Sequence, residues 1–188
     1  KVIYFSMNKF INPLKTLILI TWLKFTGQLN QPNDIGKISV NAKNKKKILM
    51  IFPENKKNSR IAGHFLKSFD KNIKKAKINF LVNKSIYHSY QFNLPENIIT
   101  YNEDNINWFK IPKKNFINKI VHEKYDAVID LHPKFNFFSA FLTLKSNAKT
   151  RIGFLSKYSY LFYNLEIDRK NTEFLEQSYL YLRKLLNI

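Results

Sequence analysis

Residues 46–66, KKILMIFPENKKNSRIAGHFL, contain the junction that decides the fold. Residues 47–53 are an apolar run bounded by charge and proline, which is typical of a strand buried on both faces of a sheet. A polar loop follows, and residues 59–71 then have the apolar periodicity of an amphipathic helix. In α/β proteins such a loop is a usual position for phosphates and reacting groups. This loop contains two lysines, two asparagines, one glutamate and no glycine.

The same alternation of strand and helix continues to the end of the chain. Strands are predicted over residues 47–53, 77–83, 97–101, 125–131, 150–154 and 163–167, and helices over residues 59–71, 116–123, 136–144 and 172–186. Strands separated by helices favour an α/β fold with a Rossmann-like, doubly wound parallel sheet. Ligands bind at the carboxyl ends of such strands. We therefore expect a site among the loops that follow Pro53, Val82, Leu131 and Phe154.

Residues 1–46 differ from the rest and are predicted to form an N-terminal apolar and basic helical arm with a linker, ahead of a Rossmann-like domain over residues 47–188. The apolar run at residues 17–23 is too short to cross a membrane, which takes about 20 residues. Its basic flanks, with Trp22 and Phe25, suit a helix lying in a membrane interface. A helix packed on the domain fits the same pattern, and both interpretations stay open.

The composition is strongly basic, with 32 lysines and arginines against 13 acidic residues and a net charge of +19. This excess favours a polyanionic partner, either nucleic acid or an anionic membrane surface. Only four of the basic residues are arginine, and the abundance of lysine, asparagine and isoleucine also fits the coding bias of an AT-rich genome. The scarcity of arginine and the lack of a recognition motif disfavour sequence-specific nucleic-acid binding. Cysteine is absent, which excludes disulfides and thiolate chemistry.

The loop after the strand at residues 125–131 places Asp130, His132 and Lys134 close together in the stretch DLHPKF. A histidine at a strand end can act as an acid or a base, or can bind phosphate when it is protonated. The alternative is that Asp130 caps the following turn and His132 is an ordinary, satisfied loop residue. No second spaced set of ligands accompanies the stretch, so we expect no metal site.

The short strand TRIGF at residues 150–154 contains Arg151 and Gly153. Arg151 is a candidate for binding an anionic sugar or a phosphate through two parallel hydrogen bonds, and Gly153 permits a close approach to the backbone. A structural ion pair of Arg151 with Asp126 or Asp130 explains the arginine equally well. No glycine-rich phosphate loop and no nucleophile elbow occurs in the sequence, which argues against a nucleotide hydrolase and a Rossmann dehydrogenase.

The order of these motifs resembles the N-terminal half of the bacterial heptosyltransferase family, glycosyltransferase family nine. The resemblance covers residues 46–188, and its most specific part is YDAVIDLH followed by SAFLTLKSNAKTRIGF. It implies one half of a GT-B fold, in which two Rossmann-like domains face each other. In that family the N-terminal domain binds an acceptor, typically a lipid A–core precursor of lipopolysaccharide biosynthesis, and the C-terminal domain binds a nucleotide sugar such as ADP-heptose. Such enzymes invert configuration without a bound metal, and they work as peripheral proteins at the cytoplasmic face of the inner membrane.

The sequence departs from the family pattern at the position of the catalytic base. Family members carry Gly-Asp in the loop after the first strand, and alignment without gaps places Lys57 and Asn58 there. An asparagine amide cannot accept a proton at neutral pH, so the usual base is lost. Glu54, four residues earlier, is the possible substitute base. The glycine of the family's DLHG or DLQG loop is also replaced, by Pro133, which removes a backbone donor.

We therefore predict a heptosyltransferase-like acceptor-binding domain that is non-catalytic alone, because the usual base is replaced and the donor half would follow Ile188. No cofactor is expected, and ADP-heptose would bind only where a C-terminal domain or a partner protein supplies its site. The predicted partners are an anionic glycolipid, a membrane surface or another protein. The alternative is a non-enzymatic structural or assembly subunit of a membrane-bound or nucleoprotein complex. The residues predicted to bind the anion or acceptor are Lys56, Lys57, Arg60, His132, Lys134 and Arg151.

Overall fold

The structure is a computed structural model that describes residues 16–29, 46–67, 76–87, 97–169 and 174–186. The chain divides into two compact units, residues 1–33 and residues 34–188. In the first unit a helix covers residues 16–25, and a turn follows it. Gly27, in this turn, has a φ of 66°, the left-handed conformation that glycine adopts after a helix C-terminus. Within the described ranges, no helix has the length and hydropathy needed to cross a membrane. Residues 1–15 and 30–45 lie outside the described residues, and the interfacial role predicted for residues 1–46 stays a prediction.

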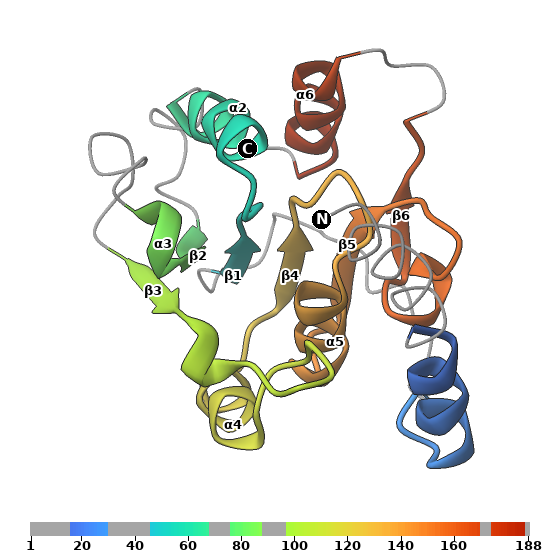
Figure 1. Cartoon of the computed structure of the whole chain (residues 1–188). Coiled ribbons are helices and arrows are strands. Elements are labelled where there is room, and N and C mark those ends of the chain that lie inside the picture. The colour runs from blue at the N-terminus through green and yellow to red at the C-terminus, as the bar shows by residue number, and fades with distance from the viewer. Residues whose placement is uncertain (1–15, 30–45, 68–75, 88–96, 170–173, 187–188) are drawn as a thin grey trace, which may run out of the picture. The chain divides into compact units, whose positions relative to one another are not determined.

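The second unit contains a sheet whose six strands are all parallel, in the order β3-β2-β1-β4-β5-β6. Its strands are β1 (Lys46–Ile51), β2 (Ala76–Asn83), β3 (Ile98–Tyr101), β4 (Ala127–Asp130), β5 (Thr150–Phe154) and β6 (Leu165–Ile167). Its helices are α2 (Lys56–Lys67), the short α3 (Lys84–Tyr87), α4 (Lys114–His122), α5 (Phe137–Lys145) and α6 (Leu175–Leu186). The predicted Rossmann-like, doubly wound parallel sheet is confirmed (Figure 1).

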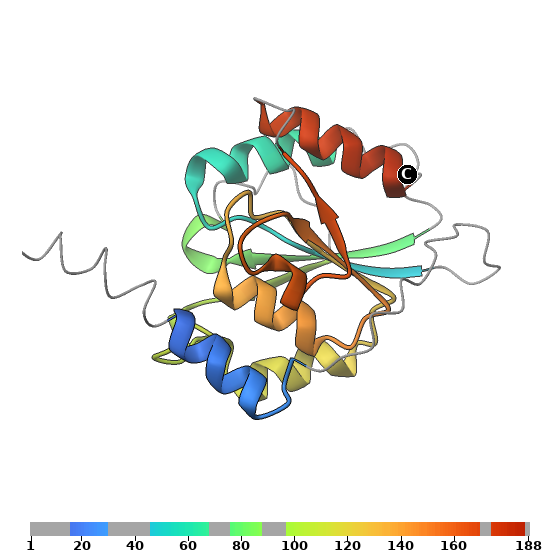
Figure 2. The same ribbon diagram turned by 90° about the vertical axis from the view of Figure 1, so that its right-hand side faces the viewer.

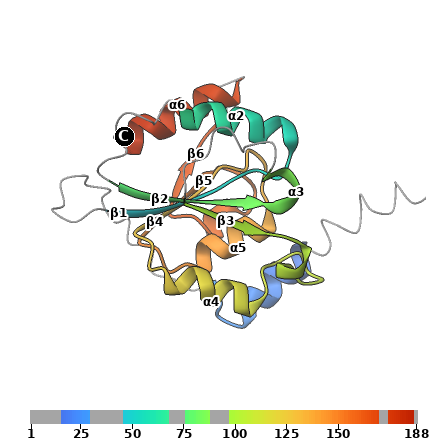
Figure 3. The same ribbon diagram turned by 90° about the vertical axis from the view of Figure 1, so that its left-hand side faces the viewer.

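Helices cover both faces of the sheet. Figures 2 and 3 show α2 and α6 side by side on one face and α4 and α5 on the other, with the strands between them. Right-handed crossovers from strand to parallel strand produce this arrangement, because each connecting helix must pack back onto the sheet. The chain reverses its direction of travel across the sheet between β1 and β4, the two strands at its centre.

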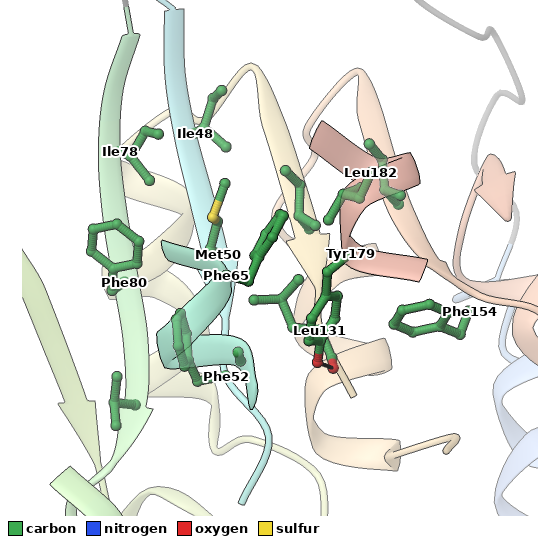
Figure 4. Close-up of a cluster of buried hydrophobic side chains, with 14 of the residues drawn as sticks. Ile48, Met50, Phe52, Phe65, Ile78, Phe80, Leu131, Phe154, Tyr179 and Leu182 are labelled. Atoms are coloured by element: carbon green, nitrogen blue, oxygen red, sulfur yellow. Dashed lines mark hydrogen bonds between the residues drawn. The ribbon is translucent and has the colours of Figure 1, made fainter. Parts of the chain in front are cut away.

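The central strands have apolar middle residues because both of their faces are buried. In β1, Ile48 and Met50 contribute to the core beneath α2 and α6, whereas Leu49 and Ile51 contribute to the core beneath α4 and α5. Figure 4 shows the first of these cores, in which the rings of Phe65 and Tyr179 lie 5.1 Å apart between centroids. The period-two alternation of a strand assigns each residue to one face.

All six predicted strands are present, with ends that differ by no more than two residues from the prediction. The predicted strand at residues 150–154 has the same bounds in the structure. The predicted helical residues 68–71 and 172–173 lie outside the described residues. Three features of the described residues were not predicted: α3, the 3-10 turn η2 (Glu103–Asn105) that precedes α4, and the 3-10 turn η3 (Ser159–Leu161) that precedes β6.

Candidate anion-binding and acid–base site

The candidate site lies at the carboxyl edge of the sheet, where the loops after β1 and β4 emerge from adjacent strands. The strand order reverses between these two strands. Side chains and backbone groups can converge there without a helix in between, which is why doubly wound sheets bind ligands at this point. Five of the eight predicted site residues lie in or directly after the β1 loop, and two lie in the β4 loop.

The first turn of α2 combines exposed basic side chains with a well-capped helix N-terminus. Asn55 caps the helix, since its Oδ1 accepts hydrogen bonds from the backbone N–H groups of Lys57 at 2.9 Å and Asn58 at 3.4 Å. Lys56, Lys57 and Arg60 are exposed, and the first turn contains no acidic residue. Positive side chains at the positive end of a helix dipole are unfavourable by themselves and become favourable when an anion binds between them.

Glu54 is held by a tyrosine from a strand two positions away in the sheet. The Tyr101 hydroxyl donates a 2.9 Å hydrogen bond to Glu54 Oε1, and the Tyr101 ring stacks on Phe138 with centroids 4.3 Å apart. Burial, followed by the Glu54 charge, raises the pKa of Tyr101 well above its usual range. One oxygen of the possible substitute base is therefore already engaged within the protein.

Asn58, at the position of the family's base, is half-buried in the first turn of α2. Its backbone N–H belongs to the cap described above. The side chain carries an amide in place of a carboxylate, so the position can exchange hydrogen bonds with a ligand without taking a proton from it.

Asp130 is the centre of a buried polar cluster that connects β4 with the segment before β6. The Asp130 carboxylate is 2% exposed. Its Oδ1 accepts hydrogen bonds from His132, from the backbone N–H at 3.0 Å and from the ring Nδ1 at 2.7 Å. Its Oδ2 accepts a 2.6 Å hydrogen bond from the Tyr163 hydroxyl. Asp130 therefore caps the turn that follows it, which is the alternative that the sequence offered for this residue. The bond to Nδ1 also orients the His132 ring.

His132 presents a second ring nitrogen that has no partner. The residue is 8% exposed, and its Nε2 atom is buried without a hydrogen bond to any group of the described chain. Because a carboxylate only accepts hydrogen bonds, it places the proton of the neutral ring on Nδ1 and leaves the lone pair on Nε2. In the neutral ring, Asp130 thus leaves Nε2 as a buried hydrogen-bond acceptor.

Tyr163 completes the cluster because Gly153 leaves room for its ring. A Cβ atom added at Gly153 would lie 2.3–2.5 Å from three atoms of the Tyr163 ring. Burial, followed by the charge of Asp130, raises the pKa of Tyr163 well above its usual range. The close approach predicted at Gly153 is therefore made by a side chain of the same chain.

We expect Gly153→Ala to lower the free energy of unfolding by about 2–3 kcal/mol, since the methyl group must displace the Tyr163 ring and break its bond to Asp130. Urea denaturation measures the loss. In a Tyr163→Ala background the same substitution should cost less than about 1 kcal/mol, because the obstructing ring is gone. Equal costs in both backgrounds would contradict this explanation of the glycine.

Arg151 does not belong to the site, and its predicted role is corrected here. The residue is 4% exposed near the amino end of β5, and its guanidinium donates to two backbone carbonyls, Phe162 O at 3.1 Å and Ala148 O at 3.2 Å. The alternative ion pair with Asp126 or Asp130 is not formed either. These bonds tie the buried arginine to the segments before and after β5, near the amino end of the strand and away from the carboxyl edge that carries the candidate site.

The β4 loop has a further basic neighbour that the sequence did not suggest. Lys134 is exposed on this loop as predicted, but Arg169 also reaches it and donates a 3.3 Å hydrogen bond to Pro133 O. Tyr101, Tyr163 and Arg169 all went unpredicted, because each comes from a distant part of the chain. Gly153 was the only local signal that something packs closely at this position. Within the described residues, no three His, Asp or Glu side chains gather where they could hold a metal ion.

The strand order defines a Rossmann-like domain. The glycosyl transferase family 9 structure from Veillonella parvula DSM 2008 has a similar fold, with a TM-score of 0.58 and 20% identity over 80% of this chain and 44% of that one. The E. coli heptosyltransferase WaaC with ADP-2-deoxy-2-fluoro heptose matches with a TM-score of 0.53 and 18% identity over 74% of this chain and 47% of that one. This chain therefore spans less than half the length of either, and the predicted likeness to heptosyltransferases is confirmed as a likeness of fold.

The sequence model of one protein family matches residues 23–185. The chain therefore belongs to that family, which is described as a family of unknown function (DUF6913). No curated protein matches the chain.

Proposed function

We propose that this chain is a heptosyltransferase-like acceptor domain that binds an anionic glycolipid at its carboxyl edge and does not by itself transfer a sugar. The observation that carries the proposal is the first turn of α2, where exposed Lys56 and Lys57 lie at the point of strand-order reversal. The fold it shares with one half of two glycosyltransferases supports the same conclusion.

The lysines and the helix N-terminus supply the recognition of an anion. The helix dipole and the two exposed ammonium groups favour a phosphate or a carboxylate in that place. His132, in the neighbouring loop, has a buried Nε2 atom without a partner, and in this proposal the loop shifts on binding so that a sugar hydroxyl donates to its lone pair. An acceptor that carries both phosphate groups and hydroxyls, such as a lipid A–core precursor, matches these two kinds of group.

The same loop supports the absence of transfer activity. A glycosyltransferase that inverts configuration needs a base for the acceptor hydroxyl. Asn58 cannot serve, and Glu54 already accepts the Tyr101 hydroxyl. In this proposal a nucleotide sugar such as ADP-heptose binds only where another domain or protein supplies its site.

We expect Lys56→Gln/Lys57→Gln to weaken binding of a phosphorylated lipid A–core fragment roughly tenfold, because two charge-assisted contacts are lost. Isothermal titration calorimetry measures the affinity, and the dephosphorylated fragment should bind the unsubstituted protein about as weakly. Lys149→Gln, at an exposed lysine on the opposite edge of the sheet, is the matched control and should leave the affinity unchanged. Equal binding of the phosphorylated and dephosphorylated fragments would overturn anion recognition.

The chain incubated with ADP-heptose and the acceptor should give no product. Product that disappears in Glu54→Gln would show that Glu54 acts as the base, and the non-catalytic part of the proposal would then be wrong.

A non-enzymatic assembly subunit remains the second candidate, and one observation favours it. The outer face of α6 exposes Leu180 and Tyr181 beside a hollow of about 290 Å³ that Gln177 and Lys184 also line. Exposed apolar groups on a helix face are typical of protein contacts. Failure of the chain to bind either form of the glycolipid fragment would favour this candidate over the acceptor domain.

A further inference from the structure

An exposed aromatic pair lies at the tip of the segment between β3 and α4. Trp108 is 73% exposed and Phe109 is 47% exposed, and their rings meet edge to face with centroids 5.2 Å apart. We call residues 106–112, which include both aromatic residues, the aromatic loop. Figure 3 shows this segment in yellow-green at the end of the sheet toward which β2 and β3 point.

The aromatic loop is held in one conformation by its own hydrogen bonds. Asn107 Oδ1 accepts from the backbone N–H groups of Phe109 at 3.0 Å and Ile111 at 3.2 Å, and Lys110 N donates to Asn107 O at 2.9 Å. Ile106 and Pro112 pair across its base as an antiparallel bridge. Lys110, at φ 61°, adopts the left-handed conformation that closes such a turn. The aromatic side chains are therefore exposed by a pre-formed scaffold, and binding through them needs no ordering of the backbone.

Basic side chains accompany the aromatic pair. Lys110, Lys113 and Lys114 are all exposed, and Lys113 and Lys114 lie at the start of α4, whose first turn contains no acidic residue. The preceding turn η2 contains two exposed acids, Glu103 and Asp104, and Glu103 lies 3.7 Å from Lys110 in an exposed pair of little strength. Among the described residues, neither Lys113 nor Lys114 forms an ion pair.

We infer that the aromatic loop docks this domain onto an anionic membrane surface. Aromatic rings enter the headgroup region while neighbouring lysines bind anionic headgroups, and this combination is the usual one at membrane interfaces. Two aromatic side chains make too small a patch for a protein partner, because a stable protein interface takes about 800 Å² from each side. A membrane needs no complementary pocket, so one or two rings on a rigid turn are sufficient.

The loop lies at the same edge of the sheet as the candidate site, because all strands are parallel and it follows β3. Docking there would bring the carboxyl edge toward lipid headgroups. The inference does not depend on glycolipid binding by Lys56 and Lys57, since different residues carry it and a different experiment tests it.

Trp108 fluorescence offers a direct test, because the chain contains only two tryptophans, Trp22 and Trp108. In full-length Trp22→Phe protein, vesicles of equal parts phosphatidylglycerol and phosphatidylcholine should shift the emission of Trp108 to shorter wavelength. Vesicles of phosphatidylcholine alone should produce no shift. Unchanged Trp108 emission in the presence of anionic vesicles would overturn the inference, including the case in which the protein binds through its N-terminal arm.

Sedimentation with the same vesicles measures the contribution of each group. Trp108→Ser/Phe109→Ser should lower the partition coefficient of the protein into the vesicles roughly tenfold. Lys113→Gln/Lys114→Gln should lower it roughly fivefold and should make the remaining binding less sensitive to salt. Tyr160→Ser, at another exposed aromatic residue, is the control and should bind as the unsubstituted protein does. Wild-type sedimentation by the Trp108→Ser/Phe109→Ser protein would likewise refute docking through this loop.

Discussion

Raising the pH from about 10 to about 12 is expected to unfold the domain, because three buried tyrosines resist ionisation in the folded state. Tyr101 and Tyr163 have pKa values raised well above the usual range, and burial raises the pKa of Tyr125 to about 12. In the unfolded chain each phenol ionises near pH 10. Above that pH the unfolded state holds fewer protons than the folded state, so stability falls as pH rises.

The size of the effect follows from the number of groups. Each retained proton lowers the free energy of unfolding by about 1.4 kcal/mol per pH unit, so three tyrosines give a slope of up to roughly 4 kcal/mol per unit. Because an unfolded phenol is half ionised at pH 10 and Tyr125 itself ionises near pH 12, the loss over two pH units is about 6–7 kcal/mol, which is comparable with the whole stability of a typical domain. Below about pH 10 the same groups contribute no pH dependence, because they are protonated in both states.

Urea denaturation at a series of pH values measures this slope, and single substitutions assign it. Tyr163→Phe removes one titrating group while it keeps the ring against Gly153, so the slope should decrease by about a third. Tyr160→Phe, at an exposed tyrosine, should leave the profile as it is in the unsubstituted protein. A slope that Tyr163→Phe does not change would show that this phenol is not protected from ionisation.

Asp130→Ala is expected to cost about 3–5 kcal/mol of unfolding free energy. The substitution leaves the buried Tyr163 hydroxyl, the His132 backbone N–H and the His132 Nδ1 without the acceptor that satisfies all three. Each unsatisfied buried group costs about 1–3 kcal/mol, and the cavity left by the carboxylate adds to the cost. Circular dichroism with urea denaturation at neutral pH measures the loss.

Asp126→Ala is the matched control, since Asp126 directly precedes the same strand and is exposed. It accepts one hydrogen bond, from the backbone N–H of Lys47 at 2.8 Å, and its removal should cost no more than about 1 kcal/mol. Asp130→Asn keeps the shape of the side chain and removes its charge, so it should be intermediate in stability. It should also lower the pKa of Tyr163, because the Asp130 charge contributes to raising it. An Asp130→Ala protein as stable as Asp126→Ala would refute the central role of this carboxylate.

Sequence patterns located the strands because burial on both faces leaves a local signature. The apolar runs at β1, β4 and β5 belong to strands that contact helices on both sides of the sheet. Each run consists of consecutive residues, so the local sequence is enough to predict the strand. The proximity of Asp130 to His132 was likewise predictable, since the two residues are only two positions apart and bond to each other.

The α/β fold class and the basic first turn of α2 are predictable from the sequence, because they depend on neighbours a few residues apart. The contacts among the candidate residues become visible only in the folded chain. Tyr101 reaches Glu54 across 47 residues of sequence and Tyr163 reaches Asp130 across 33, whereas Arg151 turns inward to backbone carbonyls. The physical reason is that the register and crossovers of the sheet set these approaches, and no local periodicity encodes the distance between residues on different strands.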